Sequence, residues 1–183
     1  MEVANERWGI LYCPKGRGNK QREKIQRVLD ERKVQYDFVQ SESTDSVERL
    51  VTMLIRNGYK TIIIMGGDSA LNDAVNCLMA EEKQVRDQIA LGVIPNGMMN
   101  DFARYWGFDD DNMEQTVDWL IKRRIRTIDL GCVRYTNKKN EHCHRYFLNC
   151  VNIGLIADVM NLRRQTRSLL GSHTLSFIVS IFL

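Results

Sequence analysis

The 183-residue sequence lacks paired cysteine motifs, a membrane-spanning apolar run and a strong net charge. Its five cysteines show no CxxC spacing, so we expect free thiols in a reducing cytoplasm rather than a disulfide framework. The apolar residues 175–183 are too few for a bilayer-spanning helix, which takes about 20 residues. A formal charge of +3 gives no indication of a nucleic-acid partner.

Metal ligands are sparse as well. His142, Cys143 and His144 form a short cluster, and the two histidines would share one face of a strand. A structural zinc site takes four ligands, and no others gather near this stretch of the sequence. We therefore expect no metal site there.

The sequence does contain enough apolar residues for a core. With 44% apolar and 27% charged residues it is typical of a soluble protein, and its length allows one domain or one domain plus part of another. Basic residues gather at 15–24, 122–126 and 163–167. The first group flanks Gly16 and would meet nucleotide phosphates. The other two are either solvated helix faces or sites that attract anionic lipid headgroups.

Short apolar runs alternate with segments of helical periodicity along the first 126 residues. The predicted strands are 8–13, 35–39, 61–65 and 90–94. The predicted helices are 19–32, 45–56, 70–79, 101–105 and 113–122, with Asp45 and Glu48 as the cap of the second. Repeated strand–helix units indicate an α/β fold, with a parallel sheet between two layers of helices.

The pattern changes after residue 126. Predicted strands at 127–135 and 145–151 flank a polar turn, which indicates a hairpin rather than another crossover, and a helix is predicted at 155–164. The apolar stretch at 175–183 ends without a polar cap. We interpret it as a helix without its packing partner, so we expect a truncated chain and self-association through this stretch.

Two glycine motifs follow two of the predicted strands. Residues 66–69 (GGDS) come after the strand at 61–65, and residues 95–101 (PNGMMND) come after the strand at 90–94. Each leads into a predicted helix. Such turns leave backbone N–H groups without partners, where phosphate oxygens bind. Two of them at the carboxyl edge of one sheet would grip a polyphosphate, although glycine at either turn alone could serve only the tight bend.

These motifs resemble a known family. Residues 65–76 are similar to the GGDGTxNEVxN block of the diacylglycerol kinase catalytic domain family, which also holds sphingosine, ceramide and bacterial lipid kinases. Residues 92–107 (GVIPNGMMNDFARYWG) resemble its second signature, and residues 147–155 resemble the segment that opens its second domain. The resemblance covers nearly the whole chain. NAD kinases share the first loop, but the NDFAR block fits lipid kinases better.

The resemblance implies a fold and a domain division. Residues 1–129 would form a three-layer α/β domain of the NAD kinase and diacylglycerol kinase type, which binds the nucleotide. Residues 130–183 would begin a second, antiparallel β domain, of which a hairpin and helices are present. In the family the second domain supplies most of the apolar surface for the lipid, so we expect no such surface before residue 129 and no lipid phosphorylation by this chain alone.

The resemblance also implies an ATP-dependent lipid kinase that uses Mg²⁺ and acts on diacylglycerol or a related lipid at a membrane surface. The expected location is the cytoplasm. Peripheral contact with the inner face of the membrane is left open. Asp68 is the implied catalytic acid, which either holds Mg²⁺ through water or accepts the proton of the lipid hydroxyl; a helix N-cap is its structural alternative. The implied nucleotide-binding residues are Lys15, Gly16, Gly66, Gly67, Asp68, Ser69, Asn72, Asp73, Gly97, Met98, Asn100 and Asp101.

Several positions depart from the family pattern. Ser69 replaces the last glycine of the first block, Met98 and Met99 replace two residues of a Gly-Thr-Gly turn, and Cys13 replaces an asparagine that points toward the nucleotide base. For Asn100, a structural role in the turn is the alternative to direct contact with the ligand. Two further functions therefore stay open: a non-catalytic nucleotide- or lipid-binding homologue, and an NAD-kinase-like enzyme.

Overall fold

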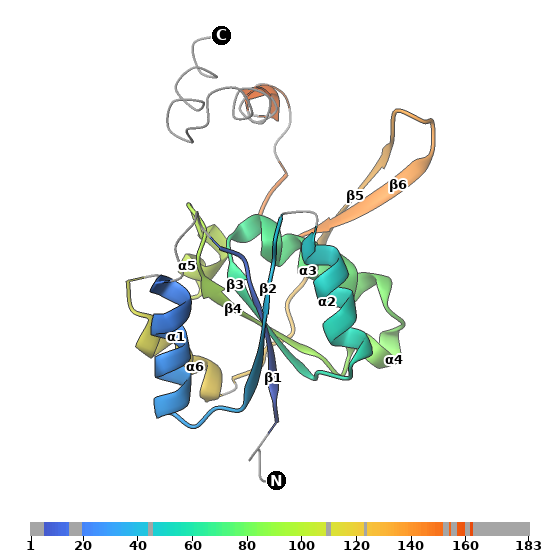
Figure 1. Ribbon diagram of the computed structural model, residues 1–183. Coiled ribbons are helices and arrows are strands. Elements are labelled where there is room, and N and C mark those ends of the chain that lie inside the picture. The colour runs from blue at the N-terminus through green and yellow to red at the C-terminus, as the bar shows by residue number, and fades with distance from the viewer. Residues whose placement is uncertain are drawn as a thin grey trace. The chain divides into compact units, whose positions relative to one another are not determined.

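The computed structural model describes residues 6–14, 20–43, 46–108, 111–122 and 124–151, together with 154, 157–159 and 162 (Figure 1). By its internal contacts the chain divides into two compact units, Met1–Asn149 and Cys150–Leu183. In the second unit residues 157–159 and 162 are helical, within the helix predicted at 155–164. The apolar stretch at 175–183 lies outside the described residues.

The first unit is built on a parallel sheet. Its elements are β1 (Trp8–Tyr12), α1 (Lys20–Glu31), β2 (Tyr36–Gln40), α2 (Ser46–Arg56), β3 (Thr61–Gly66), α3 (Asp68–Ala80), α4 (Lys83–Arg86), β4 (Ala90–Pro95), α5 (Asp101–Tyr105), α6 (Met113–Ile121), β5 (Gly131–Thr136) and β6 (His142–Phe147). Four parallel strands pair in the order β2-β1-β3-β4, and β5 and β6 form a separate antiparallel pair. The predicted fold class is confirmed.

Helices cover both faces of this sheet, as Figure 1 shows. On one face α2 and α3 pack on Leu11 and Ile64, and on the other α1 and α6 pack on Ile10 and Ile63. Successive strand residues point to opposite faces, so a strand covered on both sides needs apolar side chains at every position. The central strands β1 and β3 are accordingly buried along their whole length.

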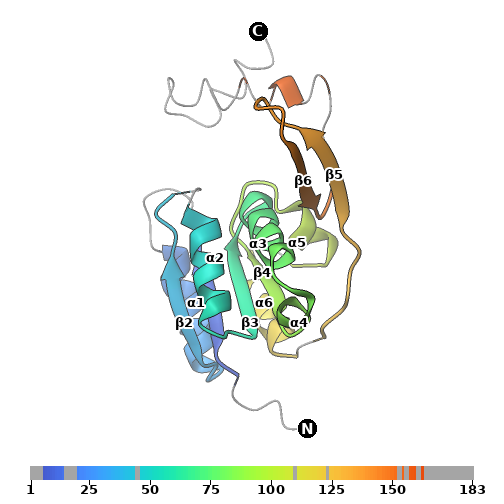
Figure 2. The same cartoon turned by 90° about the vertical axis from the view of Figure 1, so that its right-hand side faces the viewer.

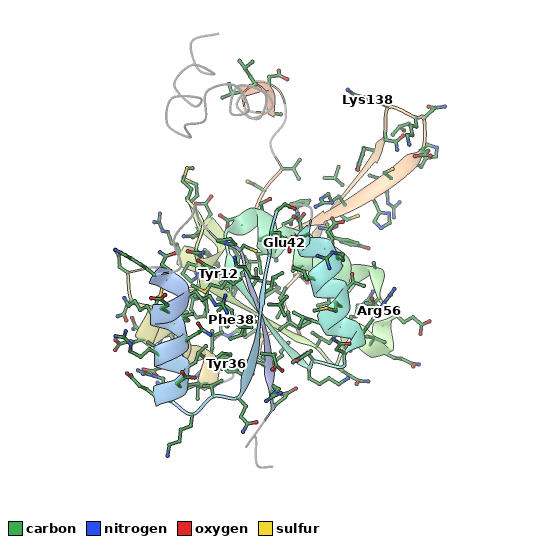
Figure 3. The ribbon with its side chains drawn as sticks, in the orientation of Figure 1. Tyr12, Tyr36, Phe38, Glu42, Arg56 and Lys138 are labelled. Atoms are coloured by element: carbon green, nitrogen blue, oxygen red, sulfur yellow. The ribbon has the colours of Figure 1, made fainter. Side chains whose placement is uncertain are left out.

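An aromatic row joins the edge strand β2 to the core. The ring centroids of Tyr12 and Phe38 lie 5.9 Å apart, and those of Phe38 and Tyr36 lie 6.0 Å apart (Figure 3). The guanidinium carbon of Arg22 on α1 is 5.2 Å from the centroid of the Phe38 ring, a cation–π contact. These contacts hold a strand whose side chains are only half-buried.

Several element boundaries differ from the predicted ones for local reasons. The helix α3 begins at Asp68, before the predicted start at residue 70, because Gly67 in an extended conformation serves as its N-cap. The helix α2 begins at Ser46, whose hydroxyl accepts a hydrogen bond from the amide of Ser43. The predicted cap Asp45 lies outside the described residues. The pattern does not predict α4, which has no buried residue and so no apolar face.

The hairpin differs more. Its strands meet with Thr136 opposite His142, whereas the predicted strands were placed at 127–135 and 145–151. The turn decides this register, because Oδ1 of Asn137 accepts hydrogen bonds from two amides within the turn, at 2.9 and 3.0 Å. Residues 127–130, which were predicted as the start of the first strand, pair with no other strand in the described part of the chain.

Polar contacts attach the hairpin to the helical layer, beside α3 in Figure 2. The side-chain amide of Asn76 on α3 donates to the carbonyl of Tyr146 at 2.9 Å and accepts from its amide at 2.9 Å. Arg145 on β6 pairs with Asp73 on α3 and lies 3.8 Å from the carboxylate of Glu48 on α2. The hairpin is thus held by polar side chains rather than by an apolar core.

The described residues bear on two further expectations. None of their helices has the length and apolarity required to cross a bilayer. The hairpin belongs by its contacts to the first compact unit. The domain division at residue 129 stays a prediction.

Candidate functional site

The two glycine loops leave the sheet side by side at its carboxyl edge. β3 and β4 pair in register, with Gly66 opposite Pro95. A Cβ atom added to Gly67 would lie 2.9 Å from the Cα atom of Gly97, and one added to Gly97 would collide with the Cα atom of Gly67. The loops therefore touch backbone to backbone, and the predicted adjacency of the two motifs is confirmed. Only glycine allows this approach.

The first loop passes directly into the long helix α3. Its N-cap is Gly67, and no side chain caps the first turn among the described residues. The first N–H groups of a helix have no intrahelical partner, and the helix dipole adds a partial positive charge there. Ser69 lies exposed in this turn. The arrangement suits an anion such as a phosphate group.

Asp68 joins the first loop to the second. Its Oδ2 accepts a hydrogen bond from the amide of Asp101, and its Oδ1 accepts one from the amide of Phe102, both at 3.0 Å. Both amides belong to the first turn of α5, so Asp68 caps that helix from a neighbouring loop. Asp68 therefore has an N-cap role, but for a different helix than predicted. It caps α5, which follows the second loop, and not α3, which begins at Asp68 itself.

Asn100 closes the second loop on itself. Its backbone is left-handed, with φ of 54°, which asparagine tolerates better than most residues. Its Oδ1 accepts from the amide of Gly97 at 2.7 Å, and its Nδ2 donates to the carbonyl of Gly97 at 3.2 Å. The side chain is 2% exposed. Within the same loop Met98 and Met99 are more than half exposed. These contacts favour the turn role for Asn100.

The remaining predicted residues divide into two groups. Asp73 lies on α3 and pairs with Arg145 of the hairpin, and the carbonyl of Asn72 accepts from the side chain of Asn76. Both therefore contact their own helix or the hairpin. Lys15 and Gly16 lie outside the described residues. Nucleotide contact by the predicted residues stays a prediction.

The sequence pattern does not single out Asn96, which follows β4 directly. It is 4% exposed, its amide donates to the carbonyl of Gly66 at 2.9 Å, and its Nδ2 donates to the carbonyl of Cys13 at 2.8 Å. Its Oδ1 has no hydrogen-bond partner among the residues that the structure describes. The signal in the sequence is a polar residue between a buried strand and a glycine turn. That signal does not show which strand end the side chain reaches.

The Cys13 thiol at the end of β1 is not an activated nucleophile. Burial, followed by the charge of Asp73, raises the pKa of the Cys13 thiol to about 11. The thiol is therefore protonated at neutral pH, and reactive cysteines need the thiolate.

An apolar groove of about 730 Å³ is lined in part by α5. Leu71, Val75 and Leu91 are among the residues that line it, together with Tyr105 and Trp106 of α5. The segment 124–128 supplies further lining residues, among which Ile125 is 64% exposed. In that segment Arg126 places its guanidinium carbon 5.9 Å from the centroid of the Trp106 ring. The expectation that no apolar surface of this kind precedes residue 129 is wrong.

Metal ligands do not gather in the part of the chain that the structure describes. No group of three or more histidine, cysteine, aspartate or glutamate side chains lies close enough there to hold an ion. The carboxylates nearest the glycine loops are Asp68 and the exposed Asp101.

Known proteins share this chain's sequence and fold. A family model of the diacylglycerol kinase catalytic domain matches residues 7–133. A Bacillus subtilis (strain 168) protein named as a lipid kinase, YtlR, is 30% identical over 138 residues, or 74% of this chain and 42% of the relative. The diacylglycerol kinase of Staphylococcus carnosus (strain TM300) is 32% identical over 105 residues, or 57% of this chain and 30% of the relative.

A solved structure supports the fold. The crystal structure of a Bacillus anthracis str. Sterne protein described as a diacylglycerol kinase matches with a TM-score of 0.67 at 21% identity, over 90% of this chain and 56% of that one. The chain spans less than half the length of the two curated relatives. Because the family model covers all four parallel strands and both glycine loops, the chain belongs to the diacylglycerol kinase catalytic domain family.

Proposed function

We propose that the chain is the nucleotide-binding part of an ATP-dependent lipid kinase, which transfers the γ-phosphoryl group to the hydroxyl of diacylglycerol or a related lipid. The observation that carries this proposal is the backbone contact between Gly67 and Gly97. It puts the uncapped first turn of α3 beside a second glycine loop at the carboxyl edge of the sheet. The names of the relatives, lipid kinase and diacylglycerol kinase, support the reaction.

The residues present fit the phosphates of ATP. Phosphoryl transfer depends on positioning and charge compensation more than on covalent chemistry. Gly67 and Gly97 themselves carry no side chain to keep a phosphate away from the backbone, and α3 offers N–H donors and its dipole. The exposed methionines of the second loop, Met98 and Met99, leave the backbone contact between the loops intact.

Asp68 has two tasks in this proposal. Each carboxylate oxygen can accept more than one hydrogen bond, so Asp68 can cap α5 and still accept the proton of the lipid hydroxyl or hold Mg²⁺ through water. Asp101 is the second carboxylate within reach of the loops. When bound, Mg²⁺ neutralises charge on the phosphate oxygens.

The groove beside α5 supports a lipid acceptor. Its apolar lining can take an acyl chain, and Lys122, Arg124 and Arg126 on its wall match the anionic headgroups of a membrane surface. The protein would then act at the cytoplasmic face of the membrane by peripheral contact.

A non-catalytic nucleotide-binding homologue is the second candidate. The observation that favours it is the engagement of both Asp68 oxygens with the amides of α5. In that case the chain would bind ATP and Mg²⁺ without transferring phosphate.

One assay separates these functions. The purified chain is incubated with radiolabelled ATP and Mg²⁺, together with diacylglycerol micelles in one arm and NAD in the other, and nucleotide binding is measured in parallel by calorimetry. The expectation that the chain alone is silent rested on the lack of an apolar surface. Because the groove supplies one, we expect ATP binding and phosphorylation of diacylglycerol but not of NAD. Binding without transfer supports the non-catalytic homologue, transfer to NAD supports an NAD-kinase-like enzyme, and no ATP binding contradicts both proposals.

Two matched variants test the groove in the same assay. Ile125→Asp puts a charge on the groove wall, whereas Val85→Asp makes the same change at an exposed apolar residue of α4 that does not line the groove. We expect Ile125→Asp to lower lipid phosphorylation and leave nucleotide binding unchanged. Equal effects of the two variants would contradict a lipid contact at the groove.

A further inference from the structure

Asn96 links the ends of three strands. It follows β4, its backbone amide donates to Gly66 at the end of β3, and its side-chain amide donates to the carbonyl of Cys13 just past β1. Cys13 in turn donates its own amide to the carbonyl of Met65. The bond from Asn96 to Cys13 crosses 83 positions of sequence. It connects the segment that leaves β1 to the loop that contains Gly97.

The side chain of Asn96 is a poor choice if stability were its only role. Its Oδ1 is buried and has no partner in the described part of the chain, and a buried acceptor without a partner lowers the stability of the folded state. A leucine has nearly the same shape and would remove this loss together with the single bond to Cys13. The structure therefore keeps a buried amide whose one favourable contact joins two strand ends at the candidate site.

We propose that Asn96 is a positioning residue of the nucleotide site, which sets the spacing between the end of β1 and the second glycine loop through its bond to the Cys13 carbonyl. The inference rests on the proposed nucleotide-binding function. A polyphosphate that contacts several loops binds tightly only when the loops are already held at the right spacing. Loss of the bond leaves the fold in place but lets the chain at Cys13 move relative to Gly97.

A positioning role and a purely structural role differ in what they predict. If Asn96 only stabilises the fold, Asn96→Leu changes the thermal unfolding midpoint and leaves nucleotide affinity as it is. If Asn96 positions the site, the same variant unfolds at a similar or higher temperature but binds nucleotide more weakly. Stability and affinity then change independently or in opposite directions, which is common at functional sites.

The test compares Asn96→Leu with Asn76→Leu in the full chain. Asn76 is a matched control, because it is also an asparagine that bonds a distant backbone, but at the hairpin. Calorimetry with ADP and Mg²⁺ measures affinity. Alkylation of Cys13, followed by peptide mass mapping with Cys77 as the internal reference, reports on order at the end of β1.

We expect the dissociation constant for ADP to rise about fivefold or more in Asn96→Leu, the ratio that one net hydrogen bond is worth. Alkylation of Cys13 should become faster relative to Cys77, since burial now holds that thiol in its unreactive form. Asn76→Leu should change neither quantity. If Asn96→Leu does not fold, Asn96→Ala replaces it, because alanine adds no bulk.

Unchanged ADP affinity in a folded Asn96 variant would overturn the positioning role and leave the proposed function standing. An equal loss of affinity in Asn76→Leu would also overturn it, because the effect would then be general. If the wild-type chain binds no ADP, the proposed function itself fails, and the positioning role fails with it.

Discussion

The two glycine loops look alike in sequence but are closed in different ways. The first passes straight into α3, and no side chain caps that helix in the part of the chain that the structure describes. In the second, Asn100 bonds both backbone groups of Gly97, and the following helix α5 takes its cap from Asp68 of the first loop. Among the described residues the first loop leaves its first-turn donors without a side-chain cap, whereas the second uses its polar groups internally.

The helices that follow the two loops differ in the same sense. α3 has 13 residues and α5 has 5, so only α3 is long enough to present a substantial dipole and a full set of first-turn donors. The phosphates are therefore expected at the first loop. The second loop is expected beside them. The hydrogen bond from the amide of Asp101 to Asp68 fixes the spacing between the two loops. We therefore expect a binding role for the first motif and a positioning role for the second.

The largest expected effect comes from breaking the contact between the loops. In Gly97→Ala the new Cβ would collide with the Cα atom of Gly67 and lie 2.6 Å from Oδ1 of Asn100. Backbone atoms cannot turn aside as a side chain can, so we expect a loss of about 3 kcal/mol in unfolding free energy and no measurable ATP binding. Denaturant unfolding and calorimetry measure the two effects.

Gly66→Ala is the matched control for that change. Its Cβ would meet the Cβ of Ala70 at 3.1 Å and the Cβ of Cys13 at 3.3 Å, contacts that a shift of a few tenths of an ångström relieves. We expect a clearly smaller loss of stability. Equal losses in the two variants would mean that the loops are not in close backbone contact in solution.

The next effect separates the two tasks of Asp68. Asp68→Ala removes the cap of α5, which should cost about 1–2 kcal/mol of unfolding free energy, and it should abolish phosphoryl transfer. Asp68→Asn keeps one acceptor oxygen and should recover part of the stability but none of the activity. Stability is read from chemical denaturation and transfer from lipid phosphorylation. Wild-type transfer by Asp68→Asn would show that the carboxylate serves only as a cap.

The smallest effect concerns the closure of the second loop. Asn100→Gly loses the two side-chain bonds to Gly97 but adopts positive φ easily, whereas Asn100→Ala loses the bonds and adds left-handed strain. We expect Asn100→Ala to be less stable than Asn100→Gly by about 1 kcal/mol, measured by thermal unfolding. A reversed order would show that the left-handed turn does not persist in solution.

Much of the fold follows from local patterns. The runs at Thr61–Gly66 and Ala90–Pro95 are rich in apolar residues, which indicates strands covered on both faces, and helical periodicity locates α2 and α6. The adjacency of the two motifs follows as well, because parallel neighbouring strands end at the same edge of a sheet. The groove beside α5 does not follow, since its walls come from distant segments.

The sequence by itself determined the strand and helix order, the parallel sheet and the positions of both glycine loops, because burial and turn formation leave periodic and local signals. Only the tertiary structure decided which partners the polar side chains in and near those loops bind. Asp68 accepts hydrogen bonds from amides of α5, Asn96 donates to the carbonyl of Cys13, and Asp73 forms an ion pair with Arg145. Each contact joins residues far apart in the chain, and the direction of a side chain between two loops depends on the packing of the whole sheet, which residue spacing does not encode.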